Sequence, residues 1–291
     1  MRRVRNRAEV EVHIRSNAEE QIELCFKLNI MKFNRHVSPI ENDVQDRSSD
    51  AWKALCRYVD ELADSGAVEF SPREALGPEL YAGIFTLPES IANLKNVTKL
   101  NLYGSKLKRI PPEIGEMTAL IYFDVYTSYS LQWFPYELTR CKNLTKSRVS
   151  TRVLYGNYKH RLNFPWLKGN PVRYQRETVK CSVCEREVIY DEILQLWISL
   201  KVGTDVLPLL VNSCSKQCTQ SLPSPHSNYV QQVHRGGTSI AQPPDYNEML
   251  RLASLQGQKE PETESHADNV EKQSAMCKPS LLEVIWKIWK K

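Results

Sequence analysis

The sequence predicts a mixed α/β protein. A short solenoid of repeated units, capped by a helix at its N-terminal end, precedes a small module held by four cysteines. Two observations support this fold class. An apolar residue followed by proline recurs three times between residues 87 and 153, and two pairs of closely spaced cysteines follow within residues 173–235. With 291 residues, of which 41% are hydrophobic, the chain can bury a sizeable core, which excludes wholesale disorder.

The repeated units begin at Leu87, Ile110 and Phe134, so that successive starts are 23 and 24 residues apart. Each unit continues with a strand-like triplet: Val97, Leu100 and Leu102, then Leu120, Phe123 and Val125, then Leu144, Ser147 and Val149. A period of 20–29 residues with L-x-x-L-x-L spacing is the leucine-rich repeat signature. One unit cannot bury its own apolar face, so we expect the strands to stack as a parallel sheet. Ser147, in place of the expected Leu, indicates that the stack is ending.

Segments on both sides of the repeats are expected to cover the ends of the stack. Residues 50–65 carry apolar side chains at intervals of three and four, with Ser49 or Asp50 to begin a helix and Gly66 to end it. We interpret this helix as the N-terminal cap. Residues 154–172 echo the apolar-Pro step without completing a unit, and we interpret them as the C-terminal cap and a linker.

The residues that alternate with the buried strand positions should face the concave side of the solenoid. These candidates for partner binding are Lys99, Asn101, Tyr103, Tyr122, Asp124, Tyr126, Lys146, Arg148 and Ser150. Tyrosine supplies contact area at low entropic cost and arginine supplies forked donors, so both suit protein binding. The composition therefore favours a protein-binding face, while an ordinary solvated strand face is the alternative.

A second candidate surface is the acid-free stretch within residues 138–176. The net charge of the chain is +5, but residues 86–172 alone hold thirteen basic and five acidic side chains. The basic-patch candidates are Arg140, Lys142, Arg152, Lys159 and Arg161, within the 140–176 stretch. Such a stretch beside a metal module could meet nucleic acid or an acidic ligand. A solvated cap surface is the alternative interpretation.

The four clustered cysteines are Cys181 and Cys184, then Cys214 and Cys218. Four thiolates suit a closed tetrahedral Zn²⁺ site, which leaves no open position and is therefore structural rather than catalytic. Between the pairs, residues 194–211 alternate around a turn and read as a hairpin, and the second pair fits one face of a helical turn. Knuckle, hairpin and helix is the order of a treble-clef-like zinc fold. The alternatives are unconnected buried thiols, or a redox C-x-x-C without its usual βαβ setting.

The chain resembles a family of uncharacterised bacterial leucine-rich repeat proteins over residues 50–235. The likeness is carried by FDVYTSYSLQWFPYELTRCKNL, VLYGNYKHRLNFPWL and LWISLKVGTDVLPLLVNSCSKQC. This resemblance implies no activity. A more general resemblance, to intracellular leucine-rich repeat proteins with the Leu-Pro or Ile-Pro step, implies protein binding. The chain departs from the usual pattern where Ser105 and Ser128 replace the buried Asn after the strand.

These patterns divide the chain into four segments. We predict a poorly ordered N-terminal segment (1–47), a capped repeat domain (48–172), a zinc-binding module (173–235) and a disordered, polar tail (236–291). The end of the tail, residues 279–291, has the spacing of an amphipathic helix that could dock on the chain itself, on a partner or on a membrane surface.

Location and activity are predicted from what the sequence lacks. No apolar run approaches the roughly 20 residues of a membrane-spanning helix. The basic N-terminus has no apolar segment of a secretory signal, and the sparse cysteines suit a reducing compartment, so we predict a cytoplasmic protein. There is no P-loop, G-x-S-x-G or H-E-x-x-H motif, and a Cys141–His160 pair would need a buried repeat position to react.

We therefore expect a non-enzymatic protein that binds a protein partner through its concave face. The rival hypothesis is nucleic-acid or acidic-ligand binding through the basic stretch. A remote alternative is a bacterial effector secreted without a signal.

Overall fold

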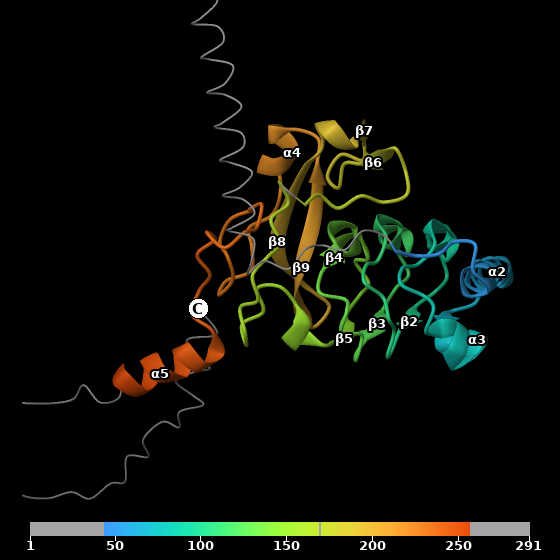
Figure 1. The fold of residues 1–291 in the computed structure, drawn as a ribbon, viewed down its shortest axis with the longest axis horizontal. Coiled ribbons are helices and arrows are strands. Elements are labelled where there is room, and N and C mark those ends of the chain that lie inside the picture. The colour runs from blue at the N-terminus through green and yellow to red at the C-terminus, as the bar shows by residue number, and fades with distance from the viewer. Residues whose placement is uncertain (1–43, 169, 257–291) are drawn as a thin grey trace, which may run out of the picture.

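The computed structural model describes residues 44–168 and 170–256, which form a mixed α/β fold with three sheets (Figure 1). The α-helices are α2 (Asp50–Ser65), α3 (Pro72–Tyr81), α4 (Lys216–Gln220) and α5 (Tyr246–Gln256). The strands are β1 (Glu69–Phe70), β2 (Lys99–Asn101), β3 (Tyr122–Val125), β4 (Phe134–Pro135), β5 (Lys146–Val149), β6 (Thr178–Lys180), β7 (Glu187–Ile189), β8 (Leu194–Val202) and β9 (Asp205–Ser213). Short 3-10 helices are η2 (Glu89–Asn93), η3 (Pro112–Glu116), η4 (Tyr136–Arg140), η5 (Thr151–Val153) and η6 (Tyr190–Glu192).

A four-stranded parallel sheet in the order β1-β2-β3-β5 runs through the repeated part of the chain. Lys99 pairs with Tyr122, and Tyr122 pairs with Lys146, so the register follows the spacing of the units. Leu100 and Phe123, which stand at equivalent positions, are fully buried. The predicted stacking of these strands in parallel is therefore confirmed.

The apolar-Pro steps begin the return segments on the other side of this core. The proline at the start of each segment has extended backbone and precedes η2, η3 or η4. Ile91, Ile114 and Leu138 are the buried apolar residues of these short helices. Helix η2 contacts η3, and η3 contacts η4. The return segments therefore stack in the same order as the strands.

The N-terminal end of the sheet is closed by α2, as the periodicity predicts. The Ser49 hydroxyl accepts a hydrogen bond from the Trp52 amide at 3.2 Å, and Gly66 ends the helix with φ of 66°. Side chains on one stripe of α2, including Leu55 and Val59, are fully buried in the core shared with the repeats. Figure 1 shows α2 and α3 together at this end of the row of strands.

The C-terminal end is closed by the turn between β8 and β9, which differs from the prediction. The Thr204 amide donates to the Ser147 hydroxyl at 3.0 Å, and the Thr204 hydroxyl donates to the Ser147 carbonyl at 2.9 Å. The Ser147 hydroxyl in turn donates to Asp205 Oδ2 at 2.6 Å. A serine stands where the repeat pattern expects leucine because this position on β5 meets a polar turn rather than another unit.

The β8–β9 hairpin also joins two apolar cores. One face, with Ile198 and Leu209, belongs to the core of the repeats, and β9 pairs in parallel with β4. The other face, with Trp197, packs against Tyr155 and Phe164 in a second cluster. Residues 154–172 thus cover the far side of the hairpin, while Leu154 at their start also packs in the core of the repeats. The predicted boundary between residues 172 and 173 divides segments that share a core.

Several expectations concern the ends of the chain. Residues 1–43 and 257–291, including the predicted helix at 279–291, lie outside the described residues. Within the described part, Gln45 accepts a hydrogen bond from the Phe85 amide at 2.7 Å, so the segment before α2 is attached. Within the predicted polar tail, the sequence also indicates a short helix at 246–255, and α5 is found there. Before it, Gln242 donates to the Arg161 carbonyl at 2.9 Å, so this part of the tail is attached to the fold. No helix in residues 44–256 has the length and apolar character that a membrane span requires.

Candidate functional site: a four-cysteine cluster and a polar sheet face

The predicted convergence of four cysteines is confirmed. The Sγ atoms of Cys181, Cys184, Cys214 and Cys218 all lie within 4.8 Å of one another. Cys184 Sγ is 3.5 Å from Cys214 Sγ, which is 3.7 Å from Cys218 Sγ. They come from two elements far apart in sequence: the turn between β6 and β7, and the start of α4. Four free thiols at this spacing can hold a metal ion as a closed set of soft ligands.

Local hydrogen bonds present both cysteine pairs to the same point. In the β6–β7 turn, the Cys181 amide donates to the Arg186 carbonyl at 2.8 Å, and Glu185 adopts a left-handed φ of 62° to complete the knuckle. At α4, the Ser215 hydroxyl caps the helix by accepting from the Cys218 amide at 3.2 Å. The first helical turn therefore fixes Cys218 beside Cys214.

The knuckle is also held by the repeats and by β9. Ser182, between the first two cysteines, donates its amide to the Asn212 carbonyl at 2.7 Å and accepts from the Asn212 amide at 2.9 Å. Arg140 on η4 donates to the Ser182 carbonyl at 3.0 Å and forms an ion pair with Glu185 at 3.4 Å. The cluster is consequently anchored to the third repeat.

The electrostatics of the metal-free cluster favour one thiolate, on Cys214. The backbone of Arg186 favours the Cys184 thiolate, but the bonds of Cys184 to Cys214 and Cys181 outweigh it and raise the pKa of Cys184 to about 11. Loss of solvent opposes ionisation of Cys214, but hydrogen bonds from Cys184, Cys181 and Cys218 outweigh it and lower the pKa of the Cys214 thiol to about 6. The Arg186 guanidinium bonds to Cys214, which raises the pKa of Arg186. This cation partly offsets the negative charge of four thiolates around a divalent ion.

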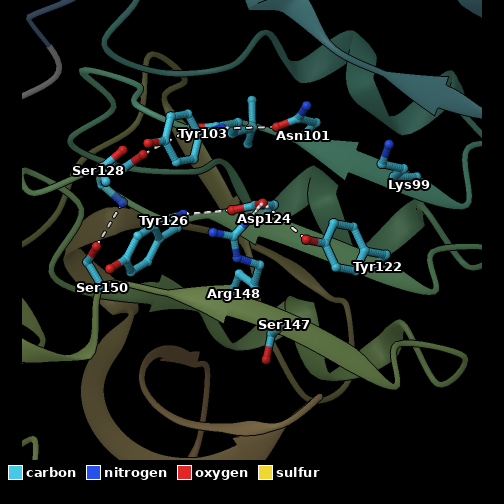
Figure 2. Close-up of polar contacts among 12 residues, drawn as sticks. Lys99, Asn101, Tyr103, Tyr122, Asp124, Tyr126, Ser128, Ser147, Arg148 and Ser150 are labelled. Carbon is cyan, nitrogen blue, oxygen red and sulfur yellow. Dashed lines mark hydrogen bonds and ion pairs between the residues drawn. The ribbon is translucent and has the colours of Figure 1, made fainter.

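The nine residues predicted to line the concave side stand at matching positions in β2, β3 and β5 and just after these strands. Figure 2 labels all of them except Lys146. Their exposure differs. Tyr103 and Tyr126 are 38% and 44% exposed, and Lys146 and Arg148 are also exposed. Asp124 and Ser150 are buried, with Asp124 only 4% exposed. Asp124 and Ser150 are therefore too buried to contact a partner directly.

Asp124 instead organises its neighbours. One carboxylate oxygen accepts from the Tyr126 amide at 2.9 Å, and the other accepts from the Tyr122 hydroxyl at 3.1 Å and from Arg148 at 2.9 Å. The Arg148 guanidinium lies over the Tyr126 ring at 5.0 Å, and this ring is 6.3 Å from that of Tyr103. Figure 2 shows the side chains of Tyr122 and Arg148 turned toward Asp124.

A row of serines behind the face replaces the expected asparagines. The Ser105 hydroxyl donates to Ser128 at 2.7 Å, and the Ser128 hydroxyl donates to the Leu102 carbonyl at 3.1 Å. Ser150 is not part of this row, because it stands three residues after Ser147 as Tyr126 stands three after Phe123; its buried hydroxyl accepts from the Thr127 amide at 2.8 Å. All of these bonds tie one unit to the next, and the serines bond to turn groups where asparagine is usual.

The basic stretch is acid-free in sequence but not in space. Acidic side chains from other segments pair with four of its arginines: Arg140 with Glu185, Arg148 with Asp124, Arg173 with Asp191 and Arg176 with Glu113. Arg161 donates to the carbonyl oxygens of Gly156 and Asn228 and is a structural residue. Of the predicted patch, Lys142 and Arg152 remain exposed.

The sequence interpretation missed three residues. Arg73 on α3 is exposed and lies over the Tyr103 ring at 5.8 Å, which extends the sheet face onto a helix. Glu137 and Tyr174 are polar groups buried on the opposite side of the repeats. The 24-residue spacing of Glu89, Glu113 and Glu137 was the available signal for the second site.

No protein-family model and no curated protein matches this chain.

Proposed function

We propose that this chain is a non-enzymatic protein-binding module that engages a protein partner through the exposed sheet face. The observation that carries the proposal is the pair of exposed tyrosines, Tyr103 and Tyr126, each stacked by an arginine. Aromatic rings and arginines held in fixed positions lose little entropy when a partner binds. Asp124 supplies that fixation by holding Arg148 and the Tyr126 backbone.

The fold that we infer for this module is a short leucine-rich repeat solenoid. The register of parallel strands at 23 and 24 residues, the short return helices after each apolar-Pro step and the bonded serine row support the assignment. The sequence resemblance to bacterial leucine-rich repeat proteins adds to it. A role in binding proteins suits this architecture, because the strand face is extended and does not depend on a catalytic pocket.

The metal we propose for the cysteine cluster is Zn²⁺, in a treble-clef-like arrangement of knuckle, hairpin and helix. Four cysteines without an open position suit a structural ion. Its role here is to hold the β6–β7 turn to α4, which stabilises the hairpin that closes the sheet.

Quantitative affinity capture tests the function. The full chain serves as bait in lysate of its native host, beside the double variant Tyr103→Ala/Tyr126→Ala. Loss of two interface tyrosines should weaken capture at least about 30-fold, because even one hot-spot truncation costs about 2 kcal/mol or more. Tyr246→Ala, on α5 and away from the face, is the matched control and should capture the partner like the parent chain.

Equal capture by the double variant and the parent would contradict the proposal. The rival function has its own readout in the same samples. If Lys142→Glu/Arg152→Glu abolishes nucleic-acid binding that falls steeply with salt, while the tyrosine variant has no effect on any capture, the basic stretch is the functional surface.

A further inference from the structure

A cavity of about 410 Å³ lies on the opposite side of the repeats from the strand face. One wall consists of the successive return segments with η2, η3 and η4, and the other of Tyr174, Arg176, Tyr190 and residues of β6 and β7. It is therefore a site separate from the proposed protein-binding face. A cavity of this size can enclose a small molecule or one long side chain.

Two buried polar atoms on its lining have no hydrogen-bond partner: Glu137 Oε2 and the Tyr174 hydroxyl. Glu137 is only 3% exposed. Ser182 of the knuckle favours the charged form of this carboxyl group, while Oε2 has no hydrogen-bond partner. Buried polar groups are almost always paired in folded proteins, and leaving one unpaired is costly.

Close packing holds Glu137 in place. A Cβ added at Gly115 on η3 would lie 2.7 Å from the Glu137 carbonyl oxygen and 2.8 Å from its Cβ. Only glycine permits this approach of η3 to η4. The backbone and Cβ of Glu137 are therefore held in place, and only the outer atoms of its side chain can move.

Three of the four cations on the lining, Lys95, Arg140 and Arg176, are paired with other groups, and the fourth, Lys180, is an exposed side chain. Arg140 holds the Ser182 carbonyl and Glu185, and Arg176 holds Glu113 at 3.3 Å. Burial raises the pKa of Glu137 to about 7 and also raises that of Glu113. An added positive charge beside Glu137 would relieve this unfavourable burial.

We propose that the cavity binds an amine or guanidinium group carried on a short aliphatic stem. Neither Glu137 Oε2 nor the Tyr174 hydroxyl has accessible surface in the unliganded chain, so binding requires these side chains to turn toward the cavity. In the complex, Glu137 Oε2 then accepts hydrogen bonds from the cation and the Tyr174 hydroxyl accepts another. The stem lies against the apolar part of the lining, which includes Ala92, Pro111 and Val179. A metal ion is the weaker candidate, because the four cysteines are the only metal-ligand group found in the described residues.

Calorimetry with the full zinc-loaded chain tests the proposal, with agmatine as the probe. We expect saturable one-to-one binding with a Kd of about 1 mM or tighter. The neutral alcohol 1-butanol should give no saturable signal, since it lacks the charge. The blocked amino acid N-acetylarginine methylamide distinguishes the source of the cation: binding equal to that of agmatine assigns the site to a polypeptide side chain, and weaker binding assigns it to a free amine.

Two variants tie binding to the cavity. Glu137→Gln should weaken agmatine at least about tenfold, because a charge-assisted hydrogen bond is lost, and Tyr174→Phe should weaken it several-fold. Glu79→Gln, an exposed change on α3, is the matched control and should not alter binding. Absence of saturable binding, or undiminished binding in both cavity variants, would overturn the proposal. If Glu137→Gln fails to fold, Tyr174→Phe decides the outcome alone.

Discussion

The two ends of the parallel sheet are closed in different ways. At the N-terminal end, α2 lies close in sequence to β1 and β2 and buries an apolar stripe with Leu55 and Val59. At the C-terminal end, the turn of the β8–β9 hairpin returns from 57 residues further along and bonds to Ser147. One closure is local and apolar, and the other is distant, partly polar and attached to the cysteine cluster. The comparison indicates that the C-terminal closure depends on groups outside the repeats.

The largest expected effect concerns the metal. Zinc binding to four thiolates contributes on the order of 10 kcal/mol to small zinc folds, so chelation or Cys214→Ser should destabilise the hairpin and the parallel sheet together. Metal analysis should find one zinc per chain, and chelation should lower the melting temperature. Cys56→Ser, on α2 and outside the cluster, should retain the metal. A folded sample with less than about half a zinc per chain would contradict the assignment.

A large effect is also expected at the local, apolar end. Leu55→Ala should lower the free energy of unfolding by about 2–5 kcal/mol, because the side chain is fully buried and leaves a cavity. Urea unfolding measures the change. Leu80→Ala, at an exposed position of α3, should change it by about 0.5 kcal/mol or less. Equal losses in the two variants would show that α2 does not close the sheet by packing.

The sequence revealed the local end better than the distant one. Apolar spacing and Ser49 give α2 directly, and the recurring triplets give the strands and their register. Ser147 correctly marked the last unit, but no local signal identified Thr204 as its partner. That contact depends on how the β8–β9 hairpin folds back onto β5. Sequence patterns within a few neighbouring residues do not reveal a contact between positions 57 residues apart.

The candidate sites also contain some features that the sequence predicts and others that only the structure reveals. The four cysteines follow from spacing alone, and alternation places the nine face residues on one side. Alternation does not reveal that Asp124 is buried under Tyr122 and Arg148, because burial there comes from neighbouring side chains. Charge counting along the chain failed for the basic stretch, since Glu185 and Asp191 reach its arginines only in space.

The C-terminal end should also respond to acid. Burial lowers the pKa of His234 in the second core to about 4, so the folded state keeps it neutral while the unfolded chain protonates near pH 6.5. The free energy of unfolding therefore has its full value above pH 6.5. It falls by up to about 3 kcal/mol as the pH drops toward 4, because only the unfolded chain takes up the proton. Urea unfolding of His234→Gln should show a smaller loss over this range than the parent, and parallel curves would contradict the assignment.

The smallest effect tests the contact at the turn itself. Gly203→Ala should cost about 1–3 kcal/mol, because φ is 61° and the new Cβ would lie 2.8 Å from Ser147 Oγ. Gly77→Ala is the matched control, since φ is 79° there but no atom lies within 4 Å of the added Cβ. A larger loss at Gly203, measured by urea unfolding, isolates the contact with Ser147. Equal losses would mean that the turn does not press on β5.

The central claim is that the hairpin completes the sheet, so that the face and the cysteine cluster belong to one cooperative unit. Native-state hydrogen exchange measures it most directly, by comparing the slowest amides of β3 with those of β9. The shared core predicts the same opening free energy for both strands, lowered by the same amount when zinc is removed. Exchange of β9 at a much lower free energy, with β3 unaffected by zinc removal, would contradict the account.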